Sequence, residues 1–561
     1  MNRIKHLVLM AVSCLTAVVS LGQSTVSFDE EHVKENFKQH ITTLASDEFE
    51  GREAGTEGEQ KAYTYISEQY EEVGMTPKGT DGFLQPFPFT ASGKATDKNA
   101  FKVNKKKFSL KEDFYPLQYS HNGTAKGKAV KAGFGIIAPG HNDYADADDV
   151  KGKIIVLEYG NPDGMHPHSR LAEFSDHATR IDSAISKGAV AVVFINSDEE
   201  TDNPKFRYSN RVTAKDIPVM FATGDAAKAI NKKNELTISL TSEIIREERA
   251  GHNVIGFIDN GAENTVVIGA HYDHLGYGDE GSLYRGKKAI HNGADDNASG
   301  VAVMIELARV LKNSGLKANN YMTIAFSAEE KGLLGSSFFV KNPTIELDKI
   351  NYMMNMDMVG RIDEKEPVLI INGVGTSEEW AKTLETNKVD GLRFKTTESG
   401  VGPSDHTSFY LKSIPVMHFF SGTHSEYHKP TDDEELINYN GQADVMTVML
   451  SVIEDMNDND KLVFIKTKDS ENKNAPRFKV TLGVVPDYAF DGQGMRIDGV
   501  SDDRPAQKAG MVAGDVVTAL GAYEVNDMMS YMKALSKFSK GDTTTVKFNR
   551  DGESQEAEIT F

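Results

Sequence analysis

Cysteine is almost absent from this sequence. Its 561 residues contain one, Cys14. A single cysteine excludes intramolecular disulfides, and it excludes Cys-ligated zinc and catalytic-cysteine chemistry from the rest of the chain. Any bound metal ion must therefore be held by His, Asp and Glu side chains.

Positive charge and long apolar runs are also scarce. The 62 Lys and Arg residues are outnumbered by 83 Asp and Glu residues, which gives a net charge of −21. A field of that sign repels phosphate backbones and anionic membrane surfaces, so nucleic acid is not an expected partner. The apolar run over residues 7–21 is too short to span a bilayer, so we expect no transmembrane anchor.

The same run has the layout of a secretory signal peptide. Arg3 and Lys5 precede it and Ser20-Leu21-Gly22 ends it, which predicts cleavage after Gly22. Residues 1–22 would then be removed, and the mature protein would be secreted or periplasmic. Lipoprotein anchoring at Cys14 is the disfavoured alternative, because the apolar stretch before it is very short.

The length and the hydrophobic patterning predict several domains, since one domain takes about 150 residues. Helical patterns within residues 24–90 and alternating strand and helix patterns over residues 252–457 predict one α/β unit, with a mostly parallel sheet between helices. Residues 91–251 have short strand-like runs and interrupt this unit as a β-rich insert. Residues 458–475 read as a polar linker, and residues 476–561 as a separate strand-rich module.

Acidic and imidazole side chains follow the predicted strands of the α/β unit, where sites form in such sheets. They occur in five places, namely His271-Tyr272-Asp273-His274, Asp295-Asp296 before a helix, Glu329-Glu330, Asp357, and Glu426-Tyr427-His428. Alone, each has an ordinary explanation as a helix cap or a solvated turn. Together, acids converging on one edge would repel each other strongly unless cations lay between them.

Charge balance favours two metal ions at this edge, because three ligating carboxylates and one hydroxide neutralise two zinc ions. Two metals about 3.5–4 Å apart can share a carboxylate and a water, act as Lewis acids and lower the water's pKa. A carboxylate that is not a ligand must then accept the proton. Glu329 and Glu330 suit these two roles, one as a metal ligand and one as the proton acceptor, because adjacent side chains do not easily point the same way.

These motifs, in this order, resemble the co-catalytic di-zinc aminopeptidase family that includes bacterial leucyl aminopeptidases and relatives of glutamate carboxypeptidase and the transferrin receptor. The resemblance covers roughly residues 252–457 and 44–77, where Ser46-Asp47-Glu48-Phe49-Glu50-Gly51-Arg52 and Gly55-Thr56 also match. It implies a three-layer zinc exopeptidase fold and two zinc ions per chain.

The resemblance also implies roles for individual residues. Asp296 would bridge both metals, with a cis peptide bond to Asn297. His271 and Asp357 would complete one metal site, and Glu330 and His428 the other. Two residues would be catalytic without binding metal, Glu329 as the general base and Asp273 by holding the His271 ring.

Other polar residues of this region receive weaker assignments. Asp405 and His406 resemble a segment near the family's substrate pocket, with helix capping as the equal alternative. The histidines His274, His291, His418 and His424 are interpreted as scaffold or rim groups rather than ligands.

The two remaining regions resemble accessory domains. The insert resembles a protease-associated domain through residues 152–157 and 217–220, a type that usually shapes the substrate pocket. The C-terminal module resembles a bacterial PDZ domain through residues 482–485, 505–510 and 514–517. A peptide or protein C-terminus would then bind by β-augmentation at Leu482, Gly483, Val484 and Val485; the alternative is a docking module without a ligand.

The expected function is therefore that of a secreted metallo-aminopeptidase acting on peptides. A carboxypeptidase or dipeptidase on the same site is one alternative, and a single-zinc glutaminyl cyclase is another. A non-catalytic binding protein is the third, but it would require lost ligands, and none of the expected ligands is missing.

Overall fold

The computed structural model describes residues 26–145, 150–160, 162, 171, 174–197, 203–204, 212, 214–232, 235–284, 286–467, 480–486, 493–500, 504–526, 528–550 and 552–561. The predicted signal peptide, with Cys14, lies outside these residues, as do residues 468–475 of the predicted linker. Within the described part of the chain, no helix combines the length and apolarity needed to cross a bilayer.

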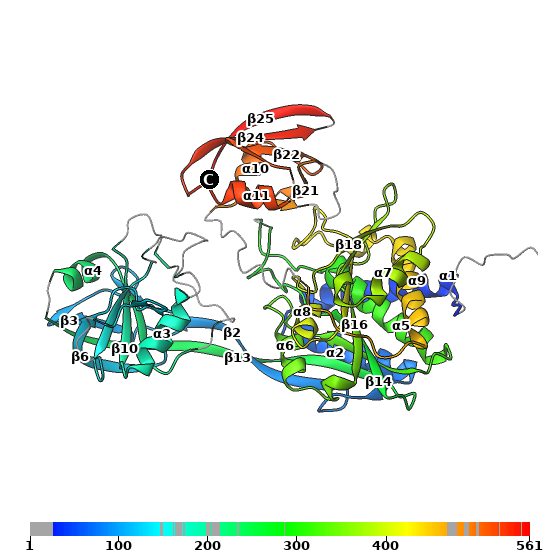
Figure 1. Ribbon diagram of the computed structural model, residues 1–561, viewed down its shortest axis with the longest axis horizontal. Helices are drawn as coiled ribbons and strands as arrows, with labels where there is room; N and C mark the ends of the chain where they lie inside the picture. The colour runs from blue at the N-terminus through cyan, green and yellow to red at the C-terminus, as the bar shows by residue number, and fades with distance from the viewer. Residues whose placement is uncertain are drawn as a thin grey trace, which may run out of the picture.

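A nine-stranded sheet forms the middle layer of the largest unit (Figure 1). Its strands are β1 (Thr76–Pro77), β2 (Leu84–Ala95), β13 (Ile244–Ile258), β14 (Asn264–His271), β15 (Asn319–Phe326), β16 (Ile350–Met356), β17 (Val368–Asn372), β18 (Arg393–Thr397) and β19 (Val416–Phe420). The order is β1-β13-β15-β14-β16-β19-β17-β18, with β2 paired to β13. The central strands β15, β14, β16 and β19 are mutually parallel, and antiparallel pairs join β13 and β17 to them.

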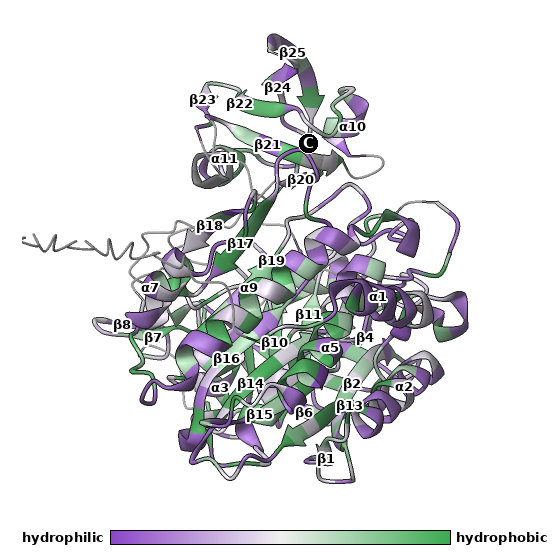
Figure 2. Ribbon diagram, turned by 90° about the vertical axis from the view of Figure 1, so that its right-hand side faces the viewer, coloured by the Kyte–Doolittle hydropathy of each residue, from purple (hydrophilic) through white to green (hydrophobic). Residues whose placement is uncertain are grey.

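Helices cover both faces of this sheet. They are α1 (Glu30–Leu44), α2 (Glu57–Val73), α5 (Gly300–Asn313), α6 (Leu334–Lys341), α7 (Glu379–Thr386), α8 (His406–Tyr410) and α9 (Tyr439–Asn457), with short helical segments η1 (Asp47–Arg52), η3 (Ala294–Ser299), η4 (Leu347–Lys349), η5 (Val374–Thr376) and η6 (Glu434–Leu436). Figure 2 shows apolar strands enclosed by helices such as α1 and α2, which carry polar residues. The predicted α/β fold is confirmed.

The alternating direction of side chains along the strands explains why the large sheet has a hydrophobic core on each of its faces. Successive side chains of a strand point to opposite faces. Val266 and Ile268 of β14 therefore pack in the core formed with α1, α2, α5 and α9, whereas Val267 packs in the core formed with α6 and α8. Helix α5 is buried along most of its length and lies directly under the sheet, which places η3, the segment before it, at the sheet's edge.

The inserted unit has its own eight-stranded sheet, in the order β4-β3-β12-β6-β9-β10-β11-β5. The strands are β3 (Ala100–Val103), β4 (Lys106–Lys107), β5 (Phe114–Pro116), β6 (Gly123–Lys131), β9 (Ile154–Glu158), β10 (Ala191–Ile195), β11 (Val219–Ala222) and β12 (Leu236–Ser242), with helices α3 (His177–Ser186) and α4 (Gly224–Asn231) and a separate pair β7 (Ile137–Ala138) and β8 (His141–Asn142). Strands β6, β9, β10 and β11 are parallel.

The insert is joined to the large sheet by a two-stranded ribbon. Strand β2 is paired antiparallel with β13 along the whole length of β2, from Leu84 with Val254 to Ala95 with Ile244. One irregularity interrupts the register, between Glu247 and Glu248. Figure 1 shows this ribbon running between the two units. The sequence patterns did not predict that both strands would belong to the large sheet.

The C-terminal unit is a six-stranded sheet with two helices. It comprises β20 (Val484–Pro486), β21 (Met495–Val500), α10 (Pro505–Lys508), β22 (Val516–Leu520), β23 (Tyr523–Glu524), α11 (Met528–Leu535), β24 (Thr543–Arg550) and β25 (Glu553–Thr560). Strand β20 ends the strand order, so it is an edge strand. It contacts the large unit, because the Thr423 hydroxyl donates a hydrogen bond of 2.6 Å to the Pro486 carbonyl.

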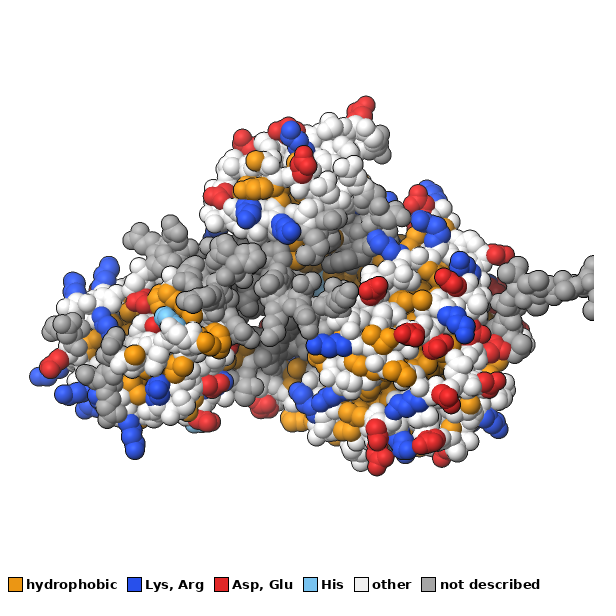
Figure 3. Space-filling model, in the orientation of Figure 1, with side chains coloured by type: hydrophobic (Ala, Val, Ile, Leu, Met, Phe, Trp, Pro, Cys, Tyr) orange, Lys and Arg blue, Asp and Glu red, His pale blue; other side chains and the backbone are white. Residues whose placement is uncertain are grey.

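Charged side chains of both signs are distributed over the surface. Figure 3 shows Lys and Arg interspersed with Asp and Glu over the visible face of the large unit. The excess of acidic residues in the sequence is therefore not concentrated in one patch on this face.

Candidate metal centre

The five predicted metal ligands come from five different segments of the large unit. His271 is the last residue of β14, Glu330 follows β15, and Asp357 follows β16. Asp296 lies in η3, and His428 lies in the loop after β19. Because the carboxyl ends of parallel strands meet at one edge of a sheet, these side chains converge.

The five side chains form two groups that share Asp296. In the first, His271 Nε2 lies 3.4 Å from Asp296 Oδ1 and 3.3 Å from Asp357 Oδ1. In the second, His428 Nε2 lies 3.3 Å from Asp296 Oδ2 and 3.3 Å from Glu330 Oε2. Asp296 thus turns one oxygen toward each group. The Asp296–Asn297 peptide bond is cis, which confirms that part of the prediction.

These spacings fit metal ions rather than direct hydrogen bonds. Ligand atoms on one tetrahedral zinc, each about 2.0–2.1 Å from the ion, lie about 3.3 Å apart. Hydrogen-bonded nitrogen and oxygen atoms lie closer, at about 2.9 Å. His271 and Asp296 are buried, and the side chains of Glu330, Asp357 and His428 are only 8–16% exposed. Carboxylates so largely removed from water are costly unless a cation neutralises them. The residues therefore fit two metal ions that share Asp296.

Backbone carbonyls orient both imidazole rings. His271 Nδ1 lies 3.1 Å from the Asp273 carbonyl oxygen, and His428 Nδ1 lies 3.0 Å from the Gly281 carbonyl oxygen. A proton on each Nδ1 can be donated to these carbonyls, which leaves each Nε2 with its lone pair facing the acids. Holding the second nitrogen in this way is typical of metal-ligating histidines.

Asp273 acts through a different contact from the predicted one. Its carboxylate lies 3.8 Å from His271 Nδ1, so its carbonyl, not its side chain, holds the ring. The carboxylate Oδ1 instead accepts a hydrogen bond of 3.0 Å from the Glu329 backbone N–H. Burial raises the pKa of Asp273 to about 8, although His271 opposes the shift.

The two adjacent glutamates have opposite electrostatic environments. Burial raises the pKa of Glu329 well above its ordinary value, and the nearby acids Asp357, Asp405 and Glu330 raise it further against the effect of His271. Burial also acts to raise the pKa of Glu330, but the imidazoles of His428 and His274 hold it well below its usual range. One carboxyl therefore favours a proton and its neighbour favours the anionic form.

Arg52 fixes the backbone around this centre. Its buried guanidinium donates to four carbonyls, those of Leu44, Tyr272, Asn292 and Gly293, at 2.6–2.8 Å. Burial lowers its pKa to about 10, so it stays protonated at neutral pH. It thereby ties the segment after β14 to the segment before η3. The sequence reasoning matched Arg52 to the family but did not assign this role.

Arg52→Met should destabilise the protein strongly, because the four carbonyls would lose their buried donor. We expect the free energy of unfolding of the large unit to fall by about 3–5 kcal/mol. Urea unfolding followed by circular dichroism measures it. Lys349→Met, which removes an exposed ion pair with Glu263, is the control and should change stability by less than about 1 kcal/mol. Equal effects of the two substitutions would rule out this role for Arg52.

Two further residues hold the loop that carries Asp296. The Asp432 carboxylate accepts hydrogen bonds from the backbone N–H groups of Asp295 and Asp296, at 3.1 and 3.0 Å. His424 Nε2 lies 3.2 Å from Asp295 Oδ2. Both residues lie in the segment that also supplies His428. No sequence spacing indicated these contacts, because they join side chains to a loop more than one hundred residues away.

The tentative substrate residues lie beside the centre but beneath its surface. Asp405 and His406 are fully buried, and the His406 ring stacks on His418 with centroids 4.4 Å apart. Burial raises the pKa of Asp405 to about 7. Asp405 occupies the N-cap position of α8, yet its side chain makes no capping hydrogen bond. Their contact with substrate stays a prediction.

The predicted peptide-binding residues of the C-terminal unit surround the start of β20. Leu482 is buried in that unit's core, and Val484 and Val485 belong to β20. Gly483 has a φ of +79°, and an added Cβ would lie 2.1 Å from Arg504 Cβ. The glycine therefore permits a turn directly before the edge strand. Peptide binding there stays a prediction.

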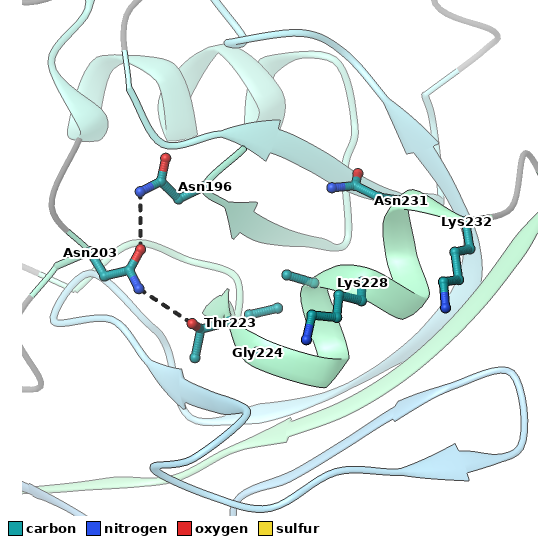
Figure 4. A pocket seen from close by; sticks show the side chains of 9 residues that line it. Asn196, Asn203, Thr223, Gly224, Lys228, Asn231 and Lys232 are labelled. Atoms are coloured by element: carbon teal, nitrogen blue, oxygen red, sulfur yellow. Dashed lines mark hydrogen bonds between the residues drawn. The ribbon is translucent and has the colours of Figure 1, made fainter. Parts of the chain in front are cut away.

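A cavity of about 400 Å³ lies in the insert, away from the acidic and imidazole residues. Figure 4 shows its polar lining, in which Asn203 hydrogen-bonds to Asn196 and Thr223. Lys228 of α4 and Lys232, which directly follows α4, are also lining residues. No predicted site residue lies among its lining residues.

Family comparisons match three parts of the chain. The profile of peptidase family M28 matches residues 253–453, which carry the centre described above. The PA domain profile matches residues 116–230, and the PDZ domain profile matches residues 464–561.

Several proteins similar to this chain are named as aminopeptidases. An aminopeptidase of Pseudomonas aeruginosa is 27% identical over 337 residues, which are 57% of this chain and 56% of the relative. An aminopeptidase of Bacillus subtilis is 26% identical over 407 residues, 67% of this chain and 80% of the relative. The solved aminopeptidase of an Aneurinibacillus strain aligns with a TM-score of 0.47 and 23% identity, covering 78% of this chain and 97% of that one. The chain spans about half the length of the Pseudomonas relative.

Proposed function

Because the chain belongs to peptidase family M28, with a PA domain and a C-terminal PDZ domain, we propose that it is a zinc aminopeptidase that removes N-terminal residues from peptides. The observation that carries the proposal is the pair of ligand groups sharing Asp296. In this proposal His271 and Asp357 hold one zinc ion, and Glu330 and His428 hold the other. When bound, the two ions would supply Lewis acidity and make a water molecule nucleophilic at neutral pH.

Glu329 is the general base in this mechanism. Its carboxylate takes a proton from the attacking water and delivers it to the leaving amine as the carbon–nitrogen bond of the substrate breaks. Two features support this role. Its backbone N–H is fixed by the Asp273 carboxylate, and the surrounding acids favour its protonated form once it has accepted the proton. Glu330, which stays anionic, is suited to metal binding instead.

Two further parts of the proposal concern the ends of the chain. Residues 1–22 act as a cleaved signal peptide, so the enzyme works in the periplasm or outside the cell. The PDZ domain takes up a peptide or a protein C-terminus along β20, which is supported by the place of β20 at the sheet's edge.

A substrate panel tests the proposed activity. Purified protein lacking residues 1–22 is given aminoacyl fluorogenic substrates, N-blocked peptides with a free C-terminus, and peptides with N-terminal glutamine, with and without a chelator. We expect release of N-terminal residues only, loss of activity with chelator, and two zinc ions per chain by elemental analysis. Cleavage of N-blocked peptides would instead select a carboxypeptidase, and cyclisation of glutamine with one zinc would select a glutaminyl cyclase.

A further inference from the structure

His274 occupies a central place in the zinc centre that its sequence position did not indicate. Its side chain is fully buried, and its Nδ1 lies 2.9 Å from Glu330 Oε1. The other carboxylate oxygen of Glu330, Oε2, faces His428 Nε2 at 3.3 Å. The two oxygens of Glu330 are therefore divided between two imidazoles.

The distances argue against His274 as a ligand of the same zinc ion. His274 Nδ1 lies 2.9 Å from Glu330 Oε1 and 3.7 Å from Asp296 Oδ2. Neither separation matches the roughly 3.3 Å expected between two ligands of one tetrahedral zinc, whereas the distances from His428 do. The shorter one has the length of a hydrogen bond, but its angles are not those of one, because His274 Nδ1 and Glu330 Oε1 have no hydrogen-bond partner in the structure. His274 thus contacts a proposed ligand. It also lies close enough to Asp296 and Glu330 that the three side chains could together hold a metal ion.

We propose that His274 is a positioning residue for Glu330. In the metal-bound protein the Nδ1–H of His274 would donate to Oε1, which it already contacts at 2.9 Å, and would hold the carboxylate with Oε2 available to the zinc ion that His428 would also bind. The inference rests on the proposed function, because it concerns one of the proposed zinc sites. A fixed hydrogen bond of this kind limits the carboxylate to one orientation and raises the affinity for the ion.

The surroundings of His274 fix its ring for this task. Its backbone N–H donates to the Arg52 carbonyl at 3.3 Å. Gly293, the residue before η3, has a φ of +58°, and an added Cβ would lie 2.6 Å from Cγ and Cδ2 of His274. The ring also packs edge-on against His428, with centroids 5.8 Å apart. The imidazole therefore has little freedom to turn away from Glu330.

The test measures zinc affinity, independently of turnover. His274→Leu removes the donor while keeping a side chain of similar bulk, and His274→Asn restores an N–H at the position of Nδ1. Competition with a chromogenic chelator gives the affinity of each zinc ion. We expect His274→Leu to weaken one of the two ions by about 10–100-fold and to leave the other unchanged. We expect His274→Asn to bind both ions within about threefold of the wild type.

His291→Asn is the matched control. His291 is also buried, but its ring contacts Ser282 and the Ala289 carbonyl rather than a proposed ligand, so both zinc affinities should be unchanged. Thermal unfolding of the metal-free variants checks that they fold.

Three results would overturn or redirect the inference. Wild-type affinity for both ions in a folded His274→Leu would overturn it. A loss of zinc affinity in His274→Asn as large as in His274→Leu would also overturn it. If His274→Leu does not fold, the zinc affinity of His274→Asn alone decides the question. Wild-type protein that binds no zinc would instead refute the proposed function, on which the inference rests.

Discussion

Glu329→Gln should keep both zinc ions and lower kcat by about 10³–10⁴-fold. The amide has the shape of the carboxylate but cannot accept a proton from water, so only the proton transfer is lost. The backbone contact with Asp273 does not involve the substituted group and should persist. Steady-state kinetics with an aminoacyl substrate measure kcat, and elemental analysis counts zinc in the same preparation.

A loss of kcat with unchanged zinc content is the result expected of a general base and not of a metal ligand. Glu364→Gln, in an exposed loop after β16, serves as the control and should leave kcat and zinc content unchanged. A Glu329→Gln protein with kcat near that of the wild type would refute the base assignment. Loss of zinc in the same variant would make Glu329 a metal ligand instead.

Asp296→Ala should remove both zinc ions at once. Asp296 turns Oδ1 toward His271 and Oδ2 toward His428, so its carboxylate is common to both groups of ligands. We expect kcat/KM to fall by about 10⁴-fold or more, since the pKa of water returns toward 15.7 without the ions. His428→Ala removes a ligand from one group only, and it should therefore lose one zinc ion per chain.

The comparison of these two variants tests the shared carboxylate directly. Zinc per chain is counted after dialysis against buffer without metal. Asp279→Ala, which changes an exposed acid paired with Lys288 near the same loops, should retain both ions. An Asp296→Ala protein that keeps one zinc ion would show that the two groups of ligands are independent. Unchanged zinc in His428→Ala would exclude that residue as a ligand.

The convergence of the acids could be predicted because it follows from strand order alone. His271, Glu330 and Asp357 come directly after apolar runs, and parallel strands bring such positions to one edge of a sheet. Helix α5 could also be predicted, since residues 301–311 are apolar apart from Glu306 and Arg309, and an almost wholly apolar helix is buried. Both patterns can be recognised from neighbouring residues in a single sequence.

The residues that support the centre could not be predicted in the same way. Arg52 acts on carbonyls more than two hundred residues away, and Asp432 acts on the N–H groups of a distant loop. These contacts join a side chain to backbone N–H or C=O groups. Because nearly every residue carries such groups, the sequence does not show which of them is the partner. His274 was interpreted as a scaffold or rim group, which stays a prediction, and its contact with Glu330 depends on a ring orientation that only the folded structure displays.

The ribbon of β2 and β13 shows where the PA domain is inserted in the large sheet. The domain lies between two strands that already pair with each other, from Leu84 with Val254 onward, so it occupies the place of a hairpin turn. Removal of the whole domain would leave the strand pairing of the large sheet intact. Joining Thr90 to Glu248, which face each other in the ladder, by a two-residue turn should yield a shorter protein that keeps the five proposed zinc ligands in place. The domain therefore lies at a position where one module could be exchanged for another without a change in the strand order of the large sheet.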